Sequence, residues 1–107
     1  MITVTYHRRY NRVDIEGHAN SGDPGHDLVC AGVSALAYTL AANVGNLEAR
    51  GMVRRPTVVL EDGKAEIDAN AKPIHKNTVE LIFQSVCVGF ELLSTNYPEY
   101  VSYEILG

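Results

Sequence analysis

The spacing of apolar residues divides the chain into seven regular elements. Apolar residues at every second position, as at Ile2 and Val4, are typical of half-buried β-strands. Apolar residues three and four positions apart, as at Val29, Val33 and Leu36, are typical of one face of a helix. The first pattern predicts strands near residues 2–6, 13–17, 57–60, 65–69 and 101–105, and the second predicts helices near 28–50 and 77–96.

Capping and stop residues support these boundaries. Asp27 is a candidate N-cap for the first helix, and Gly51 is a suitable stop after it. The second helix starts at Pro73 or at a capping-box sequence that begins with Asn77, and it ends by Pro98.

The order of the elements predicts the fold class. Short turns join consecutive strands, and Asp62 with Gly63 is a typical two-residue hairpin sequence. We therefore expect an α+β fold of two layers, with a largely antiparallel sheet of about five to six strands and two helices on one face, in the order ββαββαβ. A chain of 107 residues has the commonest domain size, so residues 1–107 are expected to form a single domain.

The second helix is apolar over more than one face. Leu81, Val88 and Leu92 lie beside its main apolar stripe. Such a helix is either buried on two sides or contacts another subunit.

Composition and charge narrow the class of protein. The chain is 46% hydrophobic with a formal net charge of −4, which is typical of a globular protein and argues against non-specific nucleic-acid binding. The first ten residues contain no apolar leader, and two cysteines are too few for a disulfide scaffold. The uncharged segment 28–47 is diluted by small and polar residues, so we interpret it as a closely packed helix and not as a membrane span. These features predict a cytoplasmic protein with reduced thiols.

The segment 17–36 holds the candidate chemistry. Cys30 is expected in the first turn of the first helix, where free N–H groups and the helix dipole would lower the pKa of its thiol. His18 ends the preceding strand, and a loop rich in turn-forming residues returns the chain to the helix start. A thiol and an imidazole that meet there form the minimal set for covalent acyl transfer, and Ser34 adds a hydroxyl one turn after Cys30.

Other interpretations of these residues stay open at this point. Cysteine is often buried, so Cys30 can be a packing residue, as Cys87 on the second helix is expected to be. Zinc could be bound by His18, His26, Asp27 and Cys30, although their spacing matches no known zinc motif. The absence of a Cys-x-x-Cys pair argues against a redox protein.

One dense motif makes the interpretation specific. Gly17-His18-Ala19, Gly22, Gly25, Asp27 and the run from Val29 to Ala35 resemble the signature of the ribosomal-processing cysteine protease family, Prp. The resemblance implies a small α+β homodimer, and we expect neither a cofactor nor a metal. It also implies a cysteine endopeptidase that removes the short N-terminal extension of ribosomal large-subunit protein twenty-seven.

The same resemblance assigns roles to individual residues. Cys30 would be the nucleophile of a Cys-His dyad, and His18 would be its general base and acid. Asp27 would organise the loop and cap the helix, and Ser34 would support the thiol. Gly17 belongs to the motif, and Gly22 and Gly25 would let the loop 19–25 close over a peptide substrate. The alternative function is a non-enzymatic, ribosome-associated binding module in which Cys30 is structural.

Overall fold

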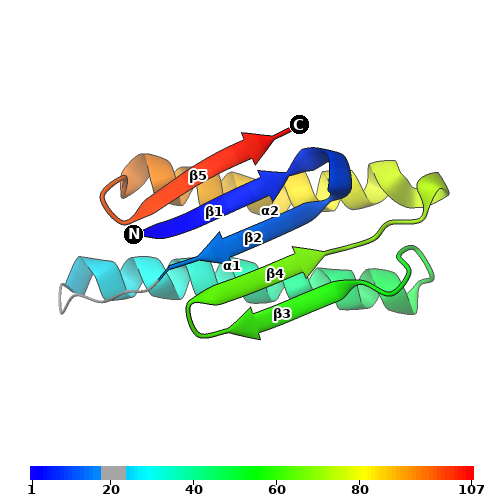
Figure 1. The fold of residues 1–107 in the computed structure, drawn as a ribbon, viewed down its shortest axis with the longest axis horizontal. Helices are drawn as coiled ribbons and strands as arrows, with labels where there is room; N and C mark the ends of the chain where they lie inside the picture. The colour runs from blue at the N-terminus through cyan, green and yellow to red at the C-terminus, as the bar shows by residue number, and fades with distance from the viewer. Residues whose placement is uncertain (18–23) are drawn as a thin grey trace.

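The computed structural model describes residues 1–17 and 24–107, with the backbone alone for 24–26. Its sheet has the strand order β3-β4-β2-β1-β5. The strands are β1 (Ile2–His7), β2 (Arg12–Glu16), β3 (Thr57–Glu61), β4 (Lys64–Asp68) and β5 (Val101–Leu106). The helices are α1 (Pro24–Ala49) and α2 (Lys76–Asn96), with two single-turn 3₁₀ segments, η1 (Arg8–Tyr10) and η2 (Pro73–His75). Both long helices lie behind the sheet in Figure 1, which confirms the predicted order and two-layer architecture.

The connections explain why both helices cover the same face. Strands β1, β2, β4 and β3 pair antiparallel in turn, whereas β1 and β5 pair parallel. Helix α1 therefore joins the parallel strands β2 and β3, and α2 joins the parallel strands β4 and β5. Such crossovers are almost always right-handed. Since β2 and β4 are antiparallel and step in opposite directions across the sheet, the same handedness places both helices on one side.

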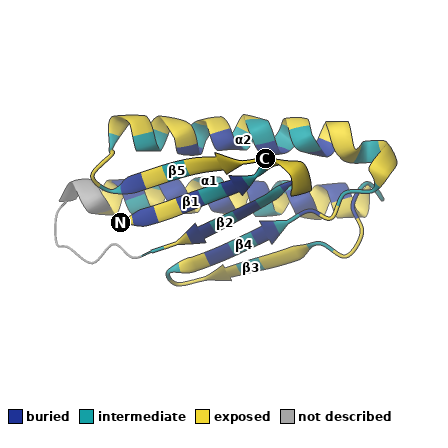
Figure 2. Ribbon diagram, turned by 45° about the horizontal axis from the view of Figure 1, so that its top comes forward, coloured by how far each residue is buried: buried dark blue, intermediate teal, exposed yellow. Residues whose placement is uncertain are grey.

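The core fills the space between the sheet and the helices. Buried residues alternate along the central strands, as Figure 2 shows, and their side chains meet a buried stripe on each helix. Tyr6 stacks on Phe83 with 6.4 Å between ring centroids. The two helices approach closely at Gly89, where an added Cβ would lie 2.7 Å from the side chain of Leu36. The buried apolar residues of the described part of the chain therefore form one continuous cluster.

The helix starts differ from the sequence prediction. Helix α1 begins at Pro24, so Asp27 lies in its first turn and is not its N-cap. Helix α2 follows the 3₁₀ turn that Pro73 opens, and its N-cap is His75 without a side-chain cap bond. The predicted stop at Gly51 is confirmed, because this glycine has φ +73° and its N–H donates to the carbonyl of Glu48.

Two helical segments, Asp27–Ala49 and Pro73–Asn96, are long and apolar enough to span a membrane by length and composition alone. Core helices of soluble proteins meet the same criterion, so this observation is weak evidence for a membrane protein.

Candidate active site

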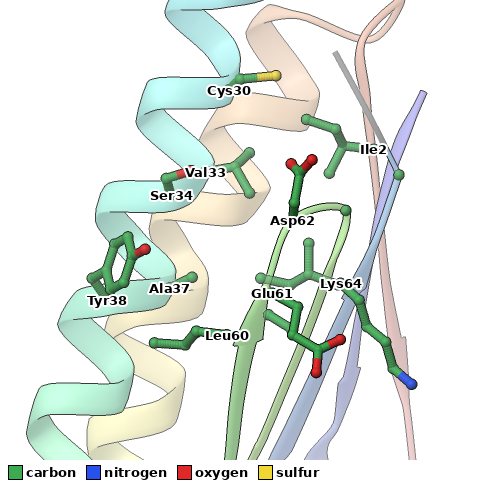
Figure 3. Close-up of a pocket in the computed structure, with 14 residues that line it drawn as sticks. Ile2, Cys30, Val33, Ser34, Ala37, Tyr38, Leu60, Glu61, Asp62 and Lys64 are labelled. Carbon is green, nitrogen blue, oxygen red and sulfur yellow. The ribbon is translucent and has the colours of Figure 1, made fainter. Parts of the chain in front are cut away.

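A cavity of about 570 Å³ lies between the first half of α1 and the β3–β4 hairpin. Its helical wall carries Cys30, Ser34 and Tyr38. The hairpin supplies the opposite wall, and the ends of β1 and β2 close the space between them, as Figure 3 shows. The remaining lining residues are Ile2, Ile15, Gly17, Val33, Ala37, Leu60, Glu61, Asp62, Gly63, Lys64 and Ala65. The cavity thus has an apolar floor and a polar hairpin rim.

Cys30 reaches this cavity from the second turn of α1. It is the seventh residue of the helix, and its side chain is half-buried and packs against the core. The prediction that it lies in the first turn is wrong because the helix begins three residues before Asp27. Only the first four N–H groups of a helix lack partners within it. The backbone N–H groups around Cys30 are therefore bonded within the helix.

The surroundings of Cys30 disfavour its thiolate. Burial raises the pKa of the Cys30 thiol most, the carboxylate of Asp27 raises it further, and the amino group of Met1 lowers it. The expected lowering by the helix start is therefore wrong, since the thiol lies beyond the first turn and one turn from a negative charge. A nucleophilic role for this thiol requires a base or a cation close by.

Gly17 connects β2 to the cavity through a backbone conformation that only glycine adopts easily. Its φ is +127°, and an added Cβ would lie 2.9 Å from the Cα of Ile2 and closer still to the carbonyl oxygen of Met1. The N–H of Gly17 donates to the carbonyl of Gly63 at 3.0 Å, which ties the end of β2 to the hairpin tip. Gly17 therefore lies at the edge of the cavity that holds Cys30.

Part of the predicted site lies outside the described residues. This part comprises His18, Gly22 and the loop positions 18–23, so the contact between His18 and Cys30 and the closure of the loop stay predictions. Gly25 is placed as the second residue of α1.

Ser34 and Asp27 occupy different positions relative to the cavity. Ser34 is exposed one turn after Cys30 and lines the same wall, in agreement with its predicted position. Asp27 is exposed in the first turn of α1, where a carboxylate interacts favourably with the helix dipole. The structure thus brings Cys30, Ser34 and Gly17 to one cavity, whereas Asp27 acts on Cys30 through its charge.

Two parts of the cavity were not predicted from the sequence. Tyr38 follows Cys30 and Ser34 at spacings of four, so the sequence alone places it on the same face of the helix. The hairpin from Leu60 to Lys64 carries no such signal, because its position depends on the strand order of the sheet.

The second cysteine has the surroundings of a packing residue. Cys87 is 2% exposed on α2 and belongs to the core. Burial raises the pKa of the Cys87 thiol to about 11, and a hydrogen bond with Tyr103 partly offsets this rise. Both cysteines are free thiols. Of the four candidate zinc ligands, His18 and the side chain of His26 lie outside the described residues.

Comparisons with known proteins extend over almost the whole chain. Residues 1–102 match the model of the family described as cysteine protease Prp. The ribosomal processing cysteine protease Prp of Staphylococcus aureus strain Mu50 is 27% identical over 100 residues, which cover 94% of this chain and 91% of that protein.

Solved structures agree with this match. The crystal structure of the S. aureus protease Prp in complex with a substrate peptide has a TM-score of 0.74 and 26% identity, covering 99% of this chain and 100% of that one. A Streptococcus mutans protein has a TM-score of 0.69 and 31% identity, covering 98% and 91%. Sequence and fold agree along the whole length, and the chain belongs to the cysteine protease Prp family.

Proposed function

We propose that this chain is a cysteine endopeptidase that removes the short N-terminal extension of ribosomal large-subunit protein twenty-seven. One observation carries the proposal: the half-buried thiol of Cys30 lines a cavity of about 570 Å³ in a chain of a cysteine protease family. The S. aureus relative is named a ribosomal processing protease, and its solved structures include a complex with a substrate peptide and one with a covalently linked product peptide.

The proposed reaction uses a dyad of Cys30 and His18. The imidazole takes the proton from the Cys30 Sγ, and the thiolate attacks the carbonyl carbon of the scissile bond. The tetrahedral intermediate collapses when the imidazolium protonates the leaving amine, which leaves the extension as a thioester on Cys30. A water molecule, deprotonated by the imidazole, then hydrolyses the thioester and regenerates the thiol.

This mechanism supplies the base that a thiol of raised pKa needs. Burial and the charge of Asp27 both raise the pKa of the Cys30 thiol, which favours its protonated form. An imidazole that accepts the proton becomes a cation beside the new thiolate, and the two charges stabilise each other. We therefore assign activation of the nucleophile to His18 and not to the helix dipole.

The developing oxyanion needs donors other than the helical backbone near Cys30, because those N–H groups already bond within the helix. The candidates are N–H groups of the loop before the helix and the exposed Ser34 hydroxyl, which lies one turn from the thiol.

The experiment is cleavage of the purified ribosomal precursor, followed by mass spectrometry. Cys30→Ala and His18→Ala are expected to abolish cleavage, and Cys87→Ala, which removes the core thiol, is the control that retains it. Full activity of Cys30→Ala would contradict the proposal. Circular dichroism of each variant separates loss of chemistry from loss of folding.

The non-enzymatic alternative has less support, because the family to which the chain belongs is one of cysteine proteases. The same assay decides it: a binding module would leave the precursor intact while forming a complex with it.

We further propose that the active form is a cytoplasmic homodimer in which α2 faces its copy. Leu81, Val88 and Leu92 are 64%, 54% and 55% exposed and lie on one side of α2. Leu81→Asp combined with Leu92→Asp should give a monomer in light scattering. Ile74→Asp, which changes an exposed apolar residue outside α2, should leave the dimer intact. A wild-type monomer at assay concentration would contradict this assembly.

A further inference from the structure

The face of the sheet turned away from the helices is strongly acidic. Strand alternation and register place six carboxylates on it, against the two cations Arg12 and Lys64. The excess of carboxylates over cations on this face gives a charge of −4, which equals the formal net charge of the whole chain. The carboxylates are Asp14, Glu16, Glu61, Glu66, Asp68 and Glu104. Charge is thus concentrated on one side of the molecule.

The two cations on this face already form ion pairs with carboxylates of the same face. Arg12 lies 2.9 Å from Asp14 and 3.4 Å from Asp68, and Lys64 lies 3.3 Å from Glu66. Glu16, Glu61 and Glu104 are exposed, and within the described part of the chain no ion pair neutralises them. The face therefore keeps uncompensated negative charge that a basic partner would neutralise.

The acidic face adjoins the Cys30 cavity at the start of β4. It is hollowed by a depression of about 320 Å³, which Thr3, Thr5, Asp14 and Glu16 help to line. Lys64 and Ala65 line both this depression and the Cys30 cavity. Figure 3 shows Lys64 pointing away from α1, whereas Asp62 on the same hairpin points to the Cys30 side. A polypeptide leaving the cavity past the hairpin would reach the acidic face within a few residues.

We propose that this acidic face is a second binding site for the substrate, which holds a Lys- and Arg-rich segment of the ribosomal protein beyond the cleaved extension. The inference rests on the proposed function. A protein that assembles onto RNA must carry cationic side chains for the phosphates, so its body is complementary to this face. The face would affect binding and not the chemical step. It raises the rate of encounter and the affinity for the precursor without contacting the reacting atoms.

The experiment compares two substrates and two double variants of the enzyme. The substrates are the full precursor and a peptide of the extension followed by neutral residues. The test variant is Glu16→Gln/Glu104→Gln, which removes two unpaired carboxylates from the open face. Its control is Glu48→Gln/Glu91→Gln, which removes the same charge from exposed positions on α1 and α2.

The expected result is a rise of KM for the precursor by about threefold to tenfold in the test variant at low salt, with kcat unchanged. KM for the neutral peptide stays the same, and the effect disappears at about 500 mM salt because the charges are screened. The control double variant behaves as wild type.

Three outcomes separate the possible failures. Equal KM values for both variants on the precursor would overturn the acidic site while leaving the protease assignment intact. A rise of KM with the neutral peptide as well would place the effect in the Cys30 cavity and would also overturn the inference. Absence of precursor cleavage by the wild-type enzyme would instead refute the proposed function itself.

Discussion

Replacing Gly17 with alanine tests the close approach that positions the cavity. The backbone of Gly17 has φ +127°, and holding a non-glycine residue there costs about 1–3 kcal/mol. The new Cβ also meets backbone of the first strand, 2.9 Å from the Cα of Ile2. Ile2 cannot move aside cheaply, because it is 4% exposed and its N–H donates to the carbonyl of Tyr100 at 2.8 Å.

The two contributions set the size of the effect. Overpacking a rigid site typically costs about 1–3 kcal/mol, so Gly17→Ala should lower the free energy of unfolding by about 2–6 kcal/mol. The free energy of unfolding of a typical domain is only about 5–15 kcal/mol, so the variant should be severely destabilised.

Urea unfolding followed by circular dichroism measures this loss as a shift of the midpoint. Gly45→Ala is the matched control, because Gly45 lies within α1 and an added Cβ there meets nothing within 4 Å. The free energy of unfolding of that control should rise by about 0.5–1 kcal/mol because alanine has the higher helix propensity. A loss below about 1 kcal/mol for Gly17→Ala, with unchanged cleavage, would refute the account of this position.

Three further predictions concern packing and ionisation. Gly89→Ala should be less stable than Gly45→Ala by about 1–3 kcal/mol in the same urea assay, because both gain helix propensity but only the Cβ at position 89 would meet the Leu36 side chain, at 2.7 Å; equal stabilities of the two variants would show that this contact is relieved without cost. Asp27→Asn should accelerate iodoacetamide alkylation of Cys30 at neutral pH, since it removes a charge that raises the pKa of this thiol, and an unchanged rate would exclude that charge as a cause. Burial raises the pKa of Cys87 from 9.0 to about 11, so the unfolded chain loses this proton first and stability should fall as pH rises from 9 to 11; Cys87→Ala should flatten that part of the curve, and an identical curve would contradict the assignment.

Much of the fold follows from local patterns in the sequence. Strict alternation, as at Ile2, Val4 and Tyr6, locates the strands because only one side of the sheet is buried. The hairpin between β3 and β4 follows from Asp62 and Gly63, whose positive φ of +77° at the glycine suits a tight turn.

The start of α1 was harder to predict for a physical reason. Asp27 is a good N-cap residue and also a good first-turn residue, because both positions favour a carboxylate near free N–H groups. The earlier Pro24 is equally suited to a first helical turn, and the helix begins there. This shift of one turn moved Cys30 away from the helix start, and burial together with the charge of Asp27 raises the pKa of its thiol, opposite to the expected direction.

The cavity could be predicted only in part. Its helical wall follows the spacing of Cys30, Ser34 and Tyr38 along α1. The opposite wall depends on β4 pairing with β2, a contact between residues about fifty positions apart that no local signal encodes. The acidic face depends on the same pairing, since it gathers carboxylates from β2, β4, β3 and β5.

The central claim is that Cys30 carries the extension as a thioester during turnover. Mass spectrometry of enzyme quenched in acid while it cleaves the precursor tests it directly. We predict a species heavier by the mass of the extension less one water, with peptide mapping that places the acyl group on Cys30. Continued cleavage with the adduct on Cys87, or with no thiol required at all, would contradict the claim.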